Sequence, residues 1–269
     1  MNDQTSMSPP ARLAPLRRAI AWCLLVLLAP CAPAAGAEAA PSWLFVHAGT
    51  LLDRPGKAPR PAATVVIRGD RIVAVRDGYV LPAAYEGAPA DAPVLDLRDR
   101  FVMPGLIDSH VHLDSDRAGI EGAMAAMTDN IAASAYEAAM NARKTLAAGF
   151  TTVRNLGNAD GVTLALRDAI AAGQMPGPRI LDAGTSISAT AGHMDPTLGF
   201  REELHDALDR HANLCDGADD CRRAVRRQVA RGVDLIKIAT TGGVNSRIGA
   251  GLGQQLFEDE AIALVETAH

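Results

Sequence analysis

The sequence predicts an α/β protein: about the first four units of a (β/α)8 TIM-type barrel, preceded by a small β-sandwich-like domain. Two observations support this fold class. Short runs rich in β-branched residues, separated by turn residues, fill residues 38–104. From residue 105 to 269, strand-like and helix-like segments alternate, which is typical of βαβ units in a parallel sheet.

Residues 1–37 have the pattern of a signal peptide. Three arginines between residues 12 and 18 precede a short apolar run, and the small residues 35–37 fit a cleavage site. The apolar run is short for a membrane span. We therefore expect an exported protein, periplasmic or secreted, with no stable membrane insertion after cleavage. An uncleaved anchor and a lipoprotein site at Cys31 are the alternatives.

The predicted β-domain begins with a strand and turn at residues 42–53. Residues 63–75 form the clearest hairpin, because two β-branched runs flank the tight-turn pair Gly69–Asp70. Residues 92–108 contain two further short strands. These elements end where the barrel pattern begins.

The barrel region contains strand patterns and helix patterns in alternation. Strands are expected at residues 106–112, 150–155, 178–183 and 233–239. Helices are expected at residues 124–148, 162–173, 221–232 and 258–269. Since a closed barrel needs eight strands, we expect this sequence to end within the barrel domain, at its N-terminal half.

Bulk composition excludes some classes of protein. The chain has 269 residues and a net charge of -5, which argues against a nucleic-acid binder that works by bulk charge. Cys215 and Cys221 lie outside the leader, and in an exported protein they could form a small-loop disulfide. Their spacing, with no histidine nearby, is not a zinc-ligand pattern.

Two histidines, His110 and His112, lie at the end of the first barrel strand. Residues i and i+2 of a strand point to the same face, so both imidazoles project together and Val111 points away. Two neutral imidazoles at the mouth of a barrel suit a divalent metal of the zinc type. Asp108 shares their parity and could be a further ligand or support one. A pair of polar strand-end histidines is the alternative interpretation.

Lys237 interrupts an apolar strand pattern. By parity it faces the barrel interior, whereas Ile236 and Ile238 face the outer helices. Burial lowers the pKa of an ammonium group, and a neutral amine can add carbon dioxide to form a carbamate. That anion has two oxygens and can bridge two metal ions. A lysine that only reaches towards the barrel mouth is the alternative.

These segments together resemble the amidohydrolase superfamily. "PGLIDSHVHLD" (104–114) resembles its first-strand signature and "GFTTVRNLG" (149–157) its second-strand motif. Residues 221–246 are similar to the subgroup with a carboxylated lysine on the fourth strand. The resemblance is strongest to metal-dependent dipeptidases and carboxypeptidases of the Xaa-Pro or Xaa-Arg type, with imidazolonepropionase-like enzymes close by. "AGHMDP" (191–196) resembles a subgroup stretch that includes a substrate-contacting histidine, here His193, although Met194 departs from it.

The resemblance implies a metal-dependent hydrolase that cleaves a C–N bond of an amide or dipeptide, with metal-bound hydroxide as nucleophile. His110 and His112 would bind one ion, and carboxylated Lys237 would bridge two divalent ions of the zinc type. The family's later histidines and its catalytic aspartate after strand 8 are not in this sequence, so no catalytic residue is assigned and the metal site is at most partial.

The function expected of the parent protein is therefore hydrolysis of a small-molecule or dipeptide substrate, with a homo-oligomer as a further option. For the sequence as given, a catalytically incompetent remnant is the alternative. Metal content and hydrolysis of Xaa-Pro substrates separate the two.

Overall fold

The computed structural model describes residues 42–269, except residues 118, 159, 210–212 and 245–250. The predicted signal peptide, residues 1–37, lies outside the described residues. The chain divides into two compact units between Val102 and Met103, two residues before the predicted boundary. Among the residues described, no helix combines the length and apolar character that crossing a membrane requires.

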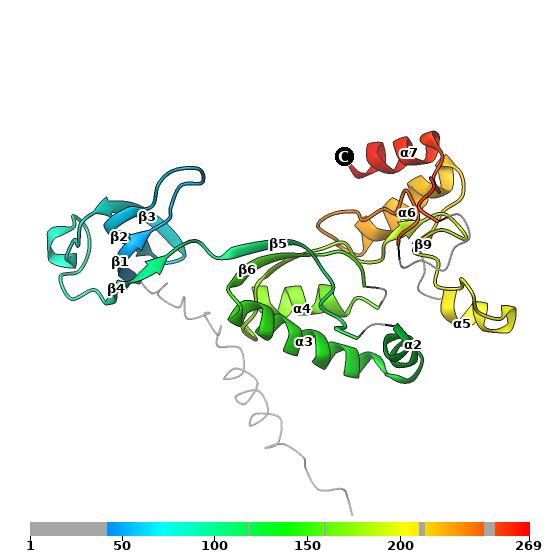
Figure 1. Cartoon of the computed structure of the whole chain (residues 1–269), viewed down its shortest axis with the longest axis horizontal. Coiled ribbons are helices and arrows are strands. Elements are labelled where there is room, and N and C mark those ends of the chain that lie inside the picture. The colour runs from blue at the N-terminus through cyan, green and yellow to red at the C-terminus, as the bar shows by residue number, and fades with distance from the viewer. Residues whose placement is uncertain (1–41, 118, 159, 210–212, 245–250) are drawn as a thin grey trace, which may run out of the picture. The chain divides into compact units, whose positions relative to one another are not determined.

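The first unit contains a mixed sheet of four strands in the order β3–β2–β1–β4 (Figure 1). Its elements are β1 (Trp43–Leu51), β2 (Arg60–Arg68), β3 (Arg71–Asp77), the 3-10 helix η1 (Pro82–Ala84) and β4 (Val94–Val102). Arg68 pairs with Arg71, so Gly69 and Asp70 form the predicted hairpin turn. β4 runs parallel to β1.

Both faces of this sheet are covered. Phe45 and Val46 are neighbours on β1 and point to opposite faces, yet both are buried. Phe45 packs with Val66 beneath Tyr85, with an edge-on ring contact of 5.7 Å. Val46 packs with Val65 on the other side. The described part of this unit forms one sheet, and the sandwich-like arrangement stays a prediction.

The second unit begins with a parallel sheet in the order β5–β6–β7. Its first elements are β5 (Leu106–Val111), α2 (Gly119–Thr128), α3 (Ile131–Ala147), β6 (Phe150–Asn155), α4 (Val162–Ala171) and β7 (Arg179–Asp182). Both α3 and α4 pack on one face of this sheet (Figure 1). Val153 and Ile180 are buried beneath them, whereas Ile107 is 71 % exposed on the other face. Parallel strands alternate with helices as predicted.

The predicted helix at residues 124–148 is interrupted. The Asn130 side chain accepts a hydrogen bond of 3.0 Å from the N–H of Ala133 and so caps α3. Because a capping residue adopts an extended backbone, α2 and α3 are separate helices.

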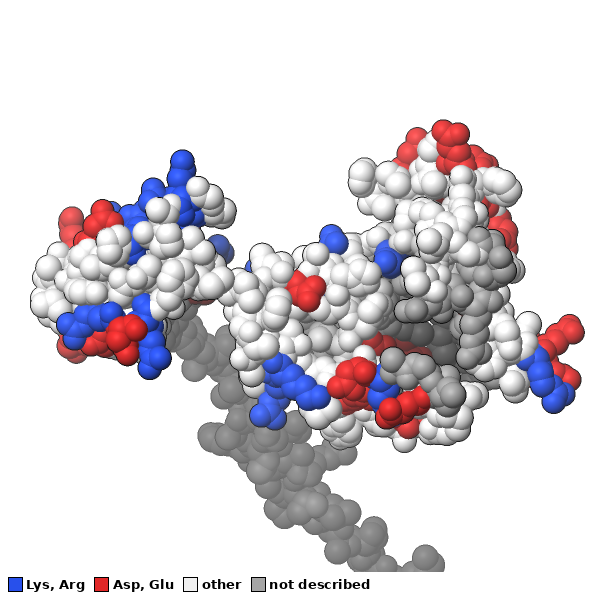
Figure 2. All heavy atoms as spheres, in the orientation of Figure 1, with Lys and Arg blue, Asp and Glu red and all other residues white. Residues whose placement is uncertain are grey.

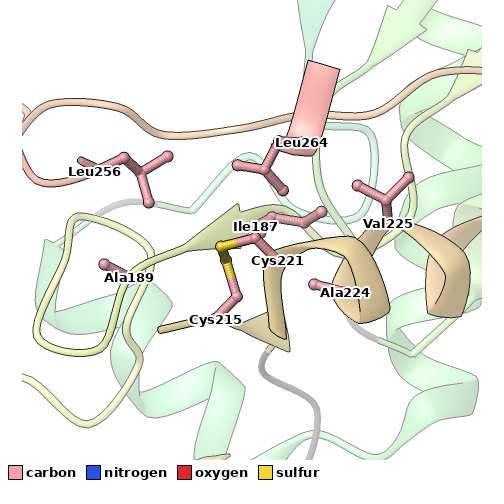
Figure 3. Packing of buried hydrophobic residues seen from close by; sticks show 8 residues of the cluster. All are labelled: Ile187, Ala189, Cys215, Cys221, Ala224, Val225, Leu256 and Leu264. Atoms are coloured by element: carbon pink, nitrogen blue, oxygen red, sulfur yellow. A yellow bond between two sulfur atoms is a disulfide. The ribbon is translucent and has the colours of Figure 1, made fainter. Parts of the chain in front are cut away.

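The rest of the second unit surrounds a small parallel pair, β8 with β9. Its elements are β8 (Ile187–Ser188), η2 (Glu202–Leu204), α5 (His205–Asp209), β9 (Asn213–Leu214), α6 (Ala218–Ala230) and α7 (Glu258–Ala268). Ile187 and Leu264 meet in the apolar cluster shown in Figure 3, which also contains the disulfide between Cys215 and Cys221. Acidic side chains gather over the start of α7 (Figure 2), where they complement the positive end of the helix dipole.

The predicted strand at residues 233–239 is wrong as a regular strand. Ile238 forms only an isolated parallel bridge with Ile187. The segment is nevertheless extended beside β7 and β8, because the N–H of Asp234 donates to the carbonyl of Asp182 at 2.8 Å. The described parallel sheet has three regular strands, and the segment around Ile238 adds an isolated bridge to β8. The partial barrel of four β/α units therefore stays a prediction.

Candidate metal centre

The His110–His112 pair lies where β5 ends. His110 belongs to the strand and His112 is the first residue after it. The two ring centroids are 5.5 Å apart, with the planes tilted by 56°. Val111, between them, packs into the cluster beneath α3 and α4. The alternation therefore places both imidazoles on the exposed side of the strand, as predicted.

Asp108 supports His110 through the backbone. Its Oδ1 accepts a hydrogen bond of 3.0 Å from the His110 N–H. Partial burial lowers the pKa of the His110 imidazole, and the positive charge of Lys237 lowers it further, while Asp108 acts in the opposite direction. The neutral form, which offers a free nitrogen lone pair, is thus favoured.

His112 is accommodated by a glycine on the neighbouring strand's loop. Gly157 has a φ of 145°, and a Cβ at this position would lie 3.4 Å from Cε1 of His112 and 3.1 Å from Oγ of Ser186. A larger residue would therefore combine an unfavourable backbone conformation with crowding of the His112 ring.

Lys237 is half-buried on the segment that follows α6. Its carbonyl accepts a hydrogen bond of 2.8 Å from the N–H of Ile187, and the N–H of Ala239 donates to the Ile187 carbonyl at 2.9 Å. Ile236 and Ile238 pack against the cluster of α6 and α7, as their parity predicted. Lys237 alternates with them, and its positive charge lowers the pKa of His110.

His193 belongs to a different part of the second unit. Its backbone N–H donates to Oε1 of Gln255 at 2.8 Å. Its ring lies so close to Gly243 that a Cβ there would collide with the imidazole. These contacts place His193 with the loop after Lys237. Within the described ranges, it does not join His110 and His112 in a group of three candidate ligands.

The donor set fits part of a metal site. His110 and His112 supply two imidazoles on one exposed side, and Lys237, whose charge acts on His110, is a cationic group that could be converted to an anionic ligand. In the part of the chain that the structure describes, no group of three or more histidine, cysteine, aspartate or glutamate residues could hold a metal ion.

A separate groove of about 470 Å³ lies on the second unit. Arg154, Leu235 and Leu264 are among its lining residues, and none of the candidate ligands is. Arg154 also donates a hydrogen bond of 3.0 Å from Nε to the carbonyl of Ser109. The wall of the groove combines apolar side chains with Arg154, Asp234 and His269, and the histidine pair does not line it.

Sequence reasoning missed the buried polar residues behind the histidine pair. Asn141, Asn155 and Asp182 are buried, and the first two hydrogen-bond the backbone of Leu113. The available signal was parity: Asn155 shares the helix-facing side of β6 with Val153, where an apolar residue is expected.

Three comparisons with known proteins agree. The model of the amidohydrolase family matches residues 101–269. Ochratoxinase of Aspergillus niger is 30 % identical over 245 residues, which is 83 % of this chain and 47 % of that protein. A dihydroorotase of Anaeromyxobacter dehalogenans is 30 % identical over 183 residues, 68 % of this chain and 36 % of the relative.

Among solved structures, a Xaa-Pro dipeptidase with methionine bound in its active site superimposes with a TM-score of 0.73 and 34 % identity, covering 84 % of this chain and 54 % of that one. The chain therefore spans about half the length of the ochratoxinase and of the dipeptidase, and about a third of the dihydroorotase. Since the family match includes the β5 histidine pair and the Lys237 segment, this chain belongs to the amidohydrolase family.

Proposed function

We propose that the parent protein is a metal-dependent hydrolase that cleaves a C–N bond of an amide or dipeptide. The observation that carries this proposal is the His110–His112 pair on the exposed side of β5, whose ring centroids are 5.5 Å apart. The positive charge of Lys237 lowers the pKa of His110. Membership of the amidohydrolase family supports the same chemistry.

His110 and His112 would bind the ion through neutral imidazole nitrogens, and Lys237 would contribute as a carboxylated, anionic ligand. A divalent ion of the zinc type, when bound, lowers the pKa of coordinated water and polarises a carbonyl group. In this chain, Asp108 holds the His110 backbone, and Gly157 leaves space for the His112 ring. These residues orient the donors.

A dipeptide-like substrate is the finer proposal. The structural neighbour named above is a Xaa-Pro dipeptidase, and the curated relatives are named ochratoxinase and dihydroorotase. His193 is our candidate for a substrate contact, because its loop is fixed by Gln255 and packs against Gly243 after the Lys237 segment.

Export is proposed on two grounds. The leader pattern of residues 1–37 supports it, and the buried disulfide between Cys215 and Cys221 is typical of oxidising compartments. N-terminal sequencing of protein recovered from the periplasm or medium would test the cleavage site after residue 37.

The test of the proposed function is metal content and hydrolysis. The full chain would be equilibrated with Zn²⁺ and bicarbonate, passed through a desalting column, and analysed for bound zinc and for cleavage of Xaa-Pro dipeptides. We expect His110→Asn and Lys237→Ala to lower bound zinc. His205→Asn is the matched control, because His205 lies in the same unit and hydrogen-bonds the carbonyl of Phe200.

A second candidate, a non-catalytic remnant, is favoured by the donor set, because the described residues supply two imidazoles and one lysine. Weak zinc binding without dipeptide cleavage would support the remnant. Two zinc ions per chain together with cleavage would exclude it. Zinc content equal in wild type and in His110→Asn would contradict the assignment of the histidine pair as the zinc site.

A further inference from the structure

We propose that Asn155 and Asn141 are positioning residues for the His110–His112 pair, and that Asp182 links this pair to the Lys237 segment. The proposal rests on the proposed function, since it assigns the network a purpose at that metal centre. It concerns residues on α3, β6 and β7 that contact neither a ligand nor the imidazole rings.

Leu113, the residue after His112, is held at both of its backbone polar groups by side chains. Its N–H donates to Oδ1 of Asn155 at 2.9 Å, and its carbonyl accepts from Nδ2 of Asn141 at 3.1 Å. Leu113 is 2 % exposed. Because both groups are fixed next to His112, the direction in which the chain leaves β5 is fixed as well.

The other end of the Asn155 side chain continues the network. Its Nδ2 donates to Oγ1 of Thr163 at 3.1 Å and to Oδ2 of Asp182 at 3.2 Å. Oδ1 of Asp182 accepts from the N–H of Gly184 at 2.7 Å. Asn155, Thr163 and Asp182 are fully buried. Burial strengthens these hydrogen bonds, because the surroundings screen charge less than water does.

Asp182 also joins the Lys237 segment. Its N–H donates to Oδ2 of Asp234 at 2.9 Å, and its carbonyl accepts from the Asp234 N–H at 2.8 Å. Nη1 of Arg167 holds the same Asp234 oxygen at 2.8 Å. Asp234 lies three residues before Lys237 in the chain. One hydrogen-bonded path therefore runs from the residue after His112 to the segment that carries Lys237. It is buried at Asn155 and Asp182 and reaches the surface at Asp234.

These polar groups stabilise the fold, because the buried N–H and carbonyl of Leu113 need hydrogen-bond partners. They also determine the direction of the backbone next to His112. Directional hydrogen bonds fix a backbone to within the tolerance that a ligand set needs. The network connects the two separate segments that carry the candidate ligands, which is where such precision has a use.

The test compares Asn155→Ala with Asn213→Ala in the full chain. Asn213 is the matched control: it is a buried asparagine of the same unit that hydrogen-bonds Ala224 and Arg227 and not β5. The readouts are urea unfolding, the imidazole NMR signals of His110 and His112 without metal, and Zn²⁺ affinity by competition with a chelating dye.

We expect both variants to unfold at lower urea. Only Asn155→Ala should shift or broaden the His112 imidazole signals and weaken Zn²⁺ binding by about tenfold or more. Asn141→Ala removes the donor to the Leu113 carbonyl and an acceptor for Lys144. It should shift the His112 signals less than Asn155→Ala does, and it replaces Asn155→Ala if that variant does not fold.

Unchanged His112 signals in Asn155→Ala and Asn141→Ala would overturn the proposal. The same holds if Asn213→Ala moves the His112 signals as far as Asn155→Ala does. Should the wild type take up no Zn²⁺, the proposed function fails, but the metal-free imidazole signals still decide whether Asn155 positions the pair.

Discussion

The two segments that carry the candidate ligands are held in place by different forces. The His110–His112 segment ends a regular strand, and buried amide side chains fix the residue that follows it. The Lys237 segment has a single isolated bridge. It is held by backbone hydrogen bonds at Asp234, Lys237 and Ala239 and by the packing of Ile236 and Ile238 against an apolar cluster. Loss of buried amide side chains should therefore affect the histidine side most, and loss of apolar packing the lysine side most.

The largest loss of stability is expected when a substitution creates a cavity in the apolar cluster that packs against the Lys237 segment. Leu264→Ala should lower the free energy of unfolding by about 3 kcal/mol, because Leu264 is 1 % exposed in the cluster that supports Ile236 and Ile238. Ile262→Ala is the control on the same helix, where the side chain is 48 % exposed, and should change it by less than about 0.5 kcal/mol. Urea denaturation would measure both, and equal losses would contradict this assignment.

Removing the disulfide tests the same side more mildly. Replacing Cys215 and Cys221 together by alanine should cost about 2 kcal/mol, since the short closed loop restricts the unfolded chain. The measurement is urea unfolding of the oxidised wild type against the double variant, with the His110 imidazole signals as a second readout. Those signals should not move, and a shift would show that the two segments are coupled through this cluster.

The histidine side is tested by Gly157→Ala. The positive φ alone should cost about 1 kcal/mol, and the new Cβ would crowd the His112 ring. Gly173→Ala provides the comparison, because Gly173 has a φ of 71° and open space around it. Gly157→Ala should lose more unfolding free energy than Gly173→Ala, and only Gly157→Ala should shift the His112 imidazole signals. Shifted His112 signals in Gly173→Ala would contradict the local explanation.

The smallest effect expected is a pH dependence of the unfolding free energy, caused by the buried carboxyl group of Asp182. Burial raises the pKa of Asp182, although hydrogen bonds from Thr163, Gly184 and Asn155 oppose the shift. The folded state therefore binds the proton more tightly than the unfolded state, whose ordinary pKa is 3.8. Stability should fall as the pH rises from 3.8 through the higher folded value, and remain at the lower level above it.

Urea unfolding at several pH values would measure this slope. Asp182→Asn should be less stable throughout, because an amide nitrogen would face groups that donate hydrogen bonds to Asp182. The unfolding free energy of this variant should also lack the fall between pH 3.8 and the pKa of Asp182 in the folded state. A slope retained in this variant would assign the titration to another group.

Local patterns predicted much of the fold. The Gly69–Asp70 turn joins β2 and β3, and the alternation of Val111 with the two histidines is correct. The alternation at Ile236 and Ile238 is correct too, yet residues 233–239 do not form a regular strand. Alternation tells which face a residue occupies, but a strand also requires a neighbour with matching backbone groups, and sequence patterns do not specify that neighbour.

Sequence patterns did not predict the buried hydrogen-bond network of Asn141, Asn155 and Asp182. Asn155 was interpreted only as part of a strand motif and Asn141 as part of a helix, because polar residues are ordinarily expected at the surface. Their partners, Leu113 and Asp182, lie far away in the chain. A hydrogen bond between such distant residues depends on the packing of three elements, which no local spacing encodes.

The double hold on Leu113 has a consequence for protein design. Transferring the His-x-His motif alone onto another parallel sheet would carry over the two rings and leave behind the amides that fix the chain after them. A graft should therefore include an asparagine on the adjacent strand and one on the covering helix. The minimal transferable unit is three elements and their shared backbone residue, rather than a tripeptide.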